Sequence, residues 1–283
     1  MTKKFLKYLK TKTKSFKVFD WVLIVFGLVA VVIFAILFFR KSTYITATVS
    51  VGEDSVVWNT MGPKYWFADS FHKGQVEKDG LGRIQAQVLN IYSYDKTPTN
   101  KTVYLDVKLN TVYNRATNTY TYKGSPVLVG STIKLNLDNV YAEGLVTEVQ
   151  GFPDHSVKQN IIVEAQLMED DSVFLGTLGV KGYLADAIQV GDTVKDNHGS
   201  EMIKVLSKTV IPAKITVTTS DGRVIEATDP MKKDVFLTLE ISAQKIDGKY
   251  YFLNDIPILI DRGIPINTPT ATYYPTVTKF LSY

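Results

Sequence analysis

The chain has 283 residues, of which 45% are hydrophobic, so it can bury a core and wholesale disorder is not expected. It contains no cysteine, which excludes disulfides, cysteine-ligated zinc and thiol catalysis. Seven lysines in residues 1–17 account for the formal net charge of +4, and the remainder carries about −3. This distribution predicts no nucleic-acid-binding domain.

The first expected element is a basic segment at residues 1–17, whose lysines recur at spacings of three and four residues. A helix would gather these lysines on one face, and such a basic amphipathic helix suits the anionic inner leaflet of a membrane. A disordered tail that only directs membrane topology is an equal alternative, because so short a helix is marginal without a surface to lie on. The lysines of the predicted membrane-surface face are Lys3, Lys7, Lys10, Lys14 and Lys17.

The second expected element is a transmembrane helix at residues 18–41. The run WVLIVFGLVAVVIFAILFF (21–39) carries no charge and spans ~28 Å as a helix, close to the thickness of a hydrocarbon core. Because the lysines precede it, the positive-inside rule predicts a single-pass protein of the inner or plasma membrane, with a cytoplasmic N-terminus and extracytoplasmic C-terminal domains. A cleaved signal peptide is disfavoured, because the run is long and Arg40 and Lys41 follow it.

Beyond the helix, residues 53–82 and 170–199 are two versions of one segment. Aligned without a gap they share twelve of thirty positions, which indicates an internal duplication. The predicted boundaries are a first extracytoplasmic β-domain at 42–150, a linker at 151–160 and a second extracytoplasmic β-domain at 161–283.

The second copy carries an insertion of about fifteen residues around 211–231. There Asp221-Gly222 joins two alternating runs. Since Asp-Gly between such runs is a strong hairpin signal, the sequence predicts an added hairpin with a type I′ turn.

Short alternating runs fill both copies, as in TVYLDVKL (102–109) and STIKLNL (131–137), and turn residues separate them. No segment after residue 41 keeps a helical period for three turns, although single helical turns are expected at YWFADSF and YLADAI. The predicted fold class is therefore all-β, with two tandem small β-barrels or sandwiches after one transmembrane helix. Glycine and aspartate at strand ends predict structural turns in both copies. These are Gly74, Asp79 and Gly82 in the first copy, and Gly191, Asp196 and Gly199 in the second.

The second copy resembles a family of bacterial, single-span, membrane-anchored β-domains of unknown function. The resemblance rests on LADAIQVGDTVKDNHG (184–199), DGRVIEATDP (221–230) and DVFLTLE (234–240). The resemblance extends to the first copy, where PVLVGSTIKLNLDNVYAEGLVTEV (126–149) is similar to the family's closing segment. The second copy lacks a counterpart of Gly144, which weakens the prediction of its closing strand. A looser similarity to mammalian-cell-entry type lipid-transfer domains and to periplasmic adaptor proteins is analogy only, because fold does not determine function.

One pattern suggests a nucleophile. Ser131 and Lys134 form an S-x-x-K motif, but the surrounding alternation predicts a strand, which directs the two side chains to opposite faces. No G-x-S-x-G, phosphate loop or dinucleotide fingerprint is present. We therefore predict no catalytic residues, no cofactor-binding residues and no cofactor.

Metal binding is not expected either. The three histidines, His72, His155 and His198, show no ligand spacing. Two short acidic stretches lack the arrangement of a dedicated calcium loop, so solvated turns are expected at Glu53, Asp54, Glu169, Asp170 and Asp171.

These observations predict a non-catalytic, membrane-anchored β-module protein that acts as a binding, assembly or scaffold component of the bacterial cell envelope. The alternative is a subunit of an envelope lipid or solute transport assembly, and an envelope hydrolase ranks last. The expected partners are the membrane and a protein partner or a second copy of the chain, without nucleic acid.

Overall fold

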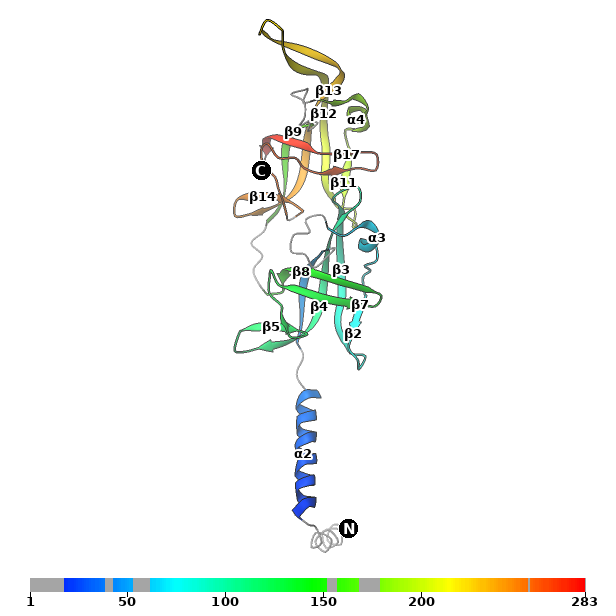
Figure 1. The fold of residues 1–283 in the computed structure, drawn as a ribbon, viewed down its shortest axis with the longest axis vertical. Helices are drawn as coiled ribbons and strands as arrows, with labels where there is room; N and C mark the ends of the chain where they lie inside the picture. The colour runs from blue at the N-terminus through cyan, green and yellow to red at the C-terminus, as the bar shows by residue number, and fades with distance from the viewer. Residues whose placement is uncertain are drawn as a thin grey trace. The chain divides into compact units, whose positions relative to one another are not determined.

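The computed structural model describes residues 18–38, 43–52, 62–151, 157–167, 179–253 and 255–282. The chain divides into two compact units, Met1–Thr43 and Tyr44–Tyr283 (Figure 1). Each unit is described by itself below.

In the first unit, α2 (Val18–Phe38) is an apolar helix with Asp20 in its first turn. Among the described residues, however, no helix meets the length and hydropathy that a bilayer crossing requires. The structure therefore corrects this part of the predicted fold class: it contains the helix but does not support a transmembrane helix at 18–41.

The first sheet of the second unit has the strand order β2-β3-β4-β1-β8-β7, and in addition β5 pairs with β4 and β6 pairs with β5. A single helical turn, α3 (Tyr65–Ala68), precedes β2, as the sequence predicts. The strands are β1 (Thr43–Val51), β2 (Val76–Lys78), β3 (Ile84–Asp95), β4 (Lys101–Asn114), β5 (Thr119–Tyr122), β6 (Ser125–Pro126), β7 (Thr132–Leu137) and β8 (Val140–Val149).

The second sheet repeats much of this connectivity. β12 pairs with β11 and β13, β9 pairs with β13 and β18, and the resulting order β11-β12-β13-β9-β18 corresponds to β2-β3-β4-β1-β8. A helical turn, α4 (Gly182–Ala187), again precedes the short first-edge strand. The strands of this sheet are β9 (Val157–Leu167), β10 (Val180–Lys181), β11 (Thr193–Lys195), β12 (Glu201–Thr218), β13 (Val224–Ile246), β14 (Lys249–Phe252), β15 (Ile256–Pro257) and β18 (Pro275–Ser282). Strands β16 (Ile266–Asn267) and β17 (Thr272–Tyr273) pair with each other in a separate two-stranded sheet.

The all-β part of the predicted fold class is confirmed. β9 begins at Val157, inside the segment expected to be a linker, and β18 supplies a closing strand although no glycine precedes it. Strand alternation explains the two cores, because successive side chains of a strand point to opposite faces. In β1, for example, Ala47 and Val49 are buried, and in β9 Val163 and Ala165 are buried.

The hairpin predicted in the second copy is confirmed, because β12 and β13 continue to pair from Ala213 with Asp229 out to Thr218 with Val224. Its predicted turn type is wrong. Only Gly222 takes a positive φ, +80°, and its N–H donates to the Thr219 carbonyl at 2.9 Å. This is the three-residue loop with a glycine bulge. A type I′ turn needs positive φ at two successive residues, and Asp221 does not adopt it.

Two glycines allow the chain to pass close to a strand at corresponding places in the two sheets. A Cβ on Gly62 would overlap the carbonyl oxygen of Lys101, at the start of β4. A Cβ on Gly179 would meet Ala213 and lie 2.9 Å from the carbonyl oxygen of Lys233 in β13. Both positions therefore require a residue without a side chain.

Candidate functional site

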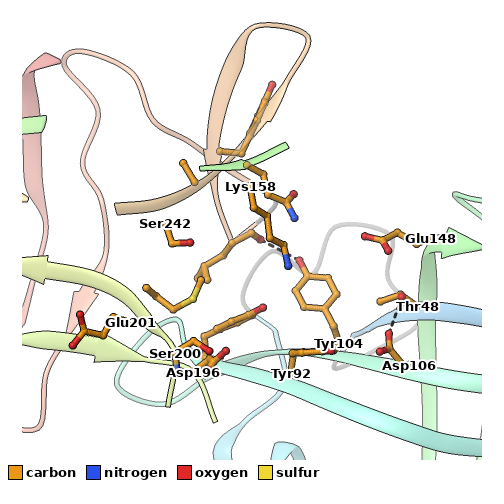
Figure 2. Close-up of a pocket in the computed structure, with 16 residues that line it drawn as sticks. Thr48, Tyr92, Tyr104, Asp106, Glu148, Lys158, Asp196, Ser200, Glu201 and Ser242 are labelled. Carbon is orange, nitrogen blue, oxygen red and sulfur yellow. Dashed lines mark hydrogen bonds between the residues drawn. The ribbon is translucent and has the colours of Figure 1, made fainter. Parts of the chain in front are cut away.

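The candidate site is a cleft of 380 Å³ between the first and second sheets of the second unit (Figure 2). Strands β3 and β4 contribute one wall, and residues of β9, β12, β13 and β14 contribute the other. Tyrosines and charged groups dominate its lining. The tyrosines are Tyr92, Tyr94, Tyr104 and Tyr251; the charged residues are Asp106, Glu148, Lys158, Asp196 and Glu201.

The turn at residues 196–199 holds the two sheets together beside this cleft. Asn197 donates its backbone N–H to the Ser93 carbonyl at 3.1 Å and accepts the Ser93 N–H at 2.8 Å through Oδ1. Its Nδ2 donates to the Ile91 carbonyl at 2.9 Å, and His198 Nε2 lies 2.7 Å from the same oxygen. The turn therefore continues the hydrogen bonding of β3 across the boundary between the sheets.

A second set of contacts joins the sheets on other sides of the cleft. The Tyr104 hydroxyl donates to the Leu253 carbonyl at 3.1 Å, and both residues are buried. Lys96 forms an ion pair with Asp255 at 2.7 Å. Because these contacts join residues that are distant in the chain, the cleft forms only when the two sheets are docked against each other.

The tyrosines of β3 and β4 form an aromatic wall. The rings of Tyr94 and Tyr104 meet edge to face with centroids 6.3 Å apart, and Tyr92 lies 5.1 Å from the ring of His198. Burial raises the pKa of Tyr94 to about 12, and the charge of Asp196 adds to the shift. Burial also raises the pKa of Tyr92, with further contributions from the negative charges of Asp106, Asp196 and Glu148. The carboxylates of Asp106, Asp196 and Glu148 therefore contribute a negative potential at this wall.

The remaining polar groups have defined partners. Asp106 Oδ1 accepts the Thr48 hydroxyl at 2.9 Å. The carboxylate of Glu201 lies 3.6 Å from the Lys204 ammonium. Lys158 extends from β9 with its ammonium directed toward Tyr104 (Figure 2). The arrangement combines aromatic faces, several carboxylates and a single ammonium group among its lining residues.

The six turn residues singled out from the sequence lie at corresponding places in the two sheets. Gly74 donates its N–H to the Val88 carbonyl and Gly191 to the Val205 carbonyl, both at 2.9 Å. In each case a β-bulge follows immediately, between Val88 and Asn90 and between Val205 and Ser207.

The aspartates act alike as well. Asp79 Oδ1 accepts the N–H groups of Leu81 and Arg83, and Asp196 Oδ1 accepts those of His198 and Ser200. Each turn closes on a glycine of positive φ, +78° at Gly82 and +83° at Gly199. Only the second turn docks on the other sheet, because it presents Asn197 and His198 where the first has Gly80 and Leu81.

The S-x-x-K residues lie at the start of β7. Ser131 Oγ donates to the Leu128 carbonyl at 2.7 Å and accepts the Leu128 N–H, as a turn serine does. Lys134 lies on the strand and pairs with Glu143 at 3.5 Å. Neither residue lines the cleft.

Metal-type ligands do not gather in the part of the chain that the structure describes, where no three histidine, aspartate or glutamate side chains form a group able to hold an ion. His72 Nδ1 lies 2.7 Å from the carbonyl of Phe71, its chain neighbour. The remaining residues considered from the sequence lie outside the described ranges: Lys3, Lys7, Lys10, Lys14, Lys17, Glu53, Asp54, His155, Glu169, Asp170 and Asp171.

Sequence reasoning missed the cleft itself. Tyr92 and Tyr94 were not singled out from the sequence, although they stand two apart and so share one face of β3. That spacing is the signal that could have indicated an aromatic wall. The facing residues come from β9 to β14, which no local pattern connects to β3.

The raised pKa of Tyr94 predicts a loss of stability at alkaline pH. A pKa above the unfolded value near 10 means that folding favours the neutral phenol, so its contribution is complete below pH 10 and is lost between pH 10 and about 12. At pH 11 this residue should cost about 1 kcal/mol of unfolding free energy. Guanidinium unfolding of the unchanged protein and of the Tyr94→Phe variant, each at pH 9 and pH 11, measures this loss of stability. The variant should lose less stability between the two values, and equal losses would contradict the assignment.

Residues 155–280 match the model of a family described as Domain of unknown function (DUF4330). The resemblance of the second copy to an uncharacterised domain family is thereby confirmed. No curated protein and no solved structure matches the chain.

Proposed function

We propose that the protein is a non-catalytic binding module of the bacterial cell envelope, and that the cleft between the two sheets is its ligand site. The observation that carries the proposal is the tyrosine-lined cavity of 380 Å³. Its volume lies within the ~300–1,000 Å³ range of small-molecule sites, which combine aromatic walls with a few placed polar groups. The hydrogen bonds from Asn197 and Tyr104 join the two walls, so little ordering of the protein is required for binding.

An internal duplication explains how such a cleft arises. Two copies of one β-module with matching strand order would each contain a similar turn after the short edge strand. The turn of the second copy has acquired Asn197 and His198, which bind the first copy's β3. The site is then a product of the docked pair, and neither copy holds it alone.

The envelope location rests on sequence features. The lysine-rich residues 1–17 suit an anionic lipid surface, and the described side chains of α2 from Trp21 to Phe34 leave large apolar surfaces exposed. The extracytoplasmic position of residues 44–283 stays a prediction, which protease accessibility in intact cells and in spheroplasts measures.

The transport alternative, with lipid passing through the β-modules, fits the cleft less well. Carboxylates such as Asp106 and Glu148 in its wall make it unsuited to an acyl chain, because burying charge against hydrocarbon is costly. A ring-shaped oligomer with co-purified lipid, measured by mass photometry and lipid analysis, would favour transport instead.

Site-specific photocrosslinking in native cells tests the binding proposal. A photoreactive amino acid replaces Gln244, which lines the cleft, and in a matched control it replaces Val224, which is exposed on the added hairpin. The full chain should sediment with membranes and should form an adduct from position 244 that is weak or missing from position 224. Equal adducts from both positions, or none from position 244, would refute the cleft as the ligand site.

A further inference from the structure

Resting on the proposed function, we infer that the cleft binds a small organic cation, an alkylated ammonium or guanidinium group held between the tyrosines and the carboxylates. The inference concerns the class of ligand, and it depends on three features of the cleft: its charge, its aromatic walls and the position of Lys158.

The charged residues of the lining favour a positive ligand. Four of them are acidic and one is basic, so the cavity carries a net negative charge. The acidic groups come from both walls, Asp106 and Glu148 from the first sheet and Asp196 and Glu201 from the second. A cation in the cavity would therefore be attracted from both sides, whereas a carboxylate or phosphate would be repelled.

The aromatic residues indicate which kind of cation fits. Tyr94 and Tyr104 meet edge to face, and Tyr92 and Tyr251 also line the cavity. Ring faces attract weakly hydrated organic cations, and several rings around one site are the usual means of binding a quaternary ammonium group. A small, strongly hydrated metal ion would need a group of oxygen ligands, and the described residues form no such group.

Lys158 shows that the cleft accommodates an ammonium group of the chain itself. Its side chain enters the cavity from β9 and directs the ammonium toward Tyr104 (Figure 2). The residue is exposed, so its side chain is able to leave for solvent. Lys158 then competes with a bound cation through like-charge repulsion, and its removal should strengthen binding.

A titration of the full-length protein tests the inference with choline, with its neutral isostere 3,3-dimethyl-1-butanol and with acetate. Tyrosine fluorescence and saturation-transfer NMR report binding. We expect choline to bind with a dissociation constant on the order of 1 mM, and the alcohol and acetate to bind at least about tenfold more weakly. Removing one nearby charge changes affinity by about fivefold at partly solvated sites. Asp106→Asn should therefore weaken choline binding about fivefold and Lys158→Gln should strengthen it about fivefold.

Asp186→Asn is the matched control, because Asp186 is exposed on α4 and does not line the cleft. It should leave choline binding unchanged, and thermal melting shows that each variant is folded. Equal binding of choline and its neutral isostere, tighter binding of acetate, or no choline binding would overturn the cation inference. A cleft-specific crosslink alongside any of these results would leave the proposed function standing, whereas loss of that crosslink would overturn the proposed function separately.

Discussion

Gly62→Ala is expected to lower the free energy of unfolding by about 3 kcal/mol. Gly62 has φ +74°, which costs a residue with a Cβ roughly 1–2 kcal/mol, and the new methyl group would overlap the Lys101 carbonyl oxygen. That oxygen belongs to the first residue of β4, so relief of the overlap must move backbone. For a folded unit of this size, the loss corresponds to a melting temperature lower by about 9 °C. Differential scanning calorimetry measures the change.

Gly80→Ala is the matched control for this substitution. Gly80 has no atom within 4 Å of an added Cβ, and it does not take a positive φ. It should alter the unfolding free energy by less than about 0.5 kcal/mol. If Gly62→Ala melts at the same temperature as Gly80→Ala, then Gly62 does not lie against the Lys101 carbonyl as described.

Glu77→Ala is expected to cost about 3 kcal/mol of stability, because it removes an acceptor from the buried side of the first sheet. Glu77 is only 6% exposed. Its Oε2 accepts the Tyr122 hydroxyl at 2.6 Å and the Asn136 N–H at 3.1 Å, and its other oxygen pairs with Lys123. Alanine would leave the buried hydroxyl and the N–H without this partner. Chemical denaturation followed by circular dichroism measures the loss.

Two further variants separate the stability that comes from the buried hydrogen-bond acceptor from the stability that comes from a surface ion pair. Glu77→Gln keeps an oxygen acceptor and should cost only about 1 kcal/mol. Glu143→Ala removes the partner of Lys134, whose side chain is 63% exposed, and should cost less than about 1 kcal/mol. A loss at Glu77→Ala no greater than at Glu143→Ala would show that the Tyr122 contact contributes little.

Local patterns predicted much of the fold because their physical causes are local. Alternation in residues 102–109 and 131–137 placed strands β4 and β7 correctly, since the side-chain period of two belongs to each strand alone. The single helical turns and the added hairpin were predicted for the same reason. Apolar composition predicted a helix within 18–41, and α2 forms there, but the inference that it spans a membrane was not supported.

The exact turn type, which depends on the sign of φ at single residues, was less predictable. Asp221-Gly222 indicated a turn, but Asp221 keeps a negative φ and the loop has three residues, so the turn type was wrong. Dipeptide composition limits the choice of turn, and the length of the loop then selects one type.

The sequence by itself determined the all-β class, the recurrence of one strand pattern and the positions of the turns. Only the tertiary structure decided where the candidate site lies. Tyr92 and Tyr94 line the cleft together with residues more than a hundred positions away in the chain, and Asn197 forms hydrogen bonds across the boundary between the two sheets. The pattern of a strand indicates which of its faces is apolar, but it does not indicate which other part of the chain will pack against that face. The pairing of those faces depends on the free energy of docking the whole sheets, which no short stretch of sequence contains.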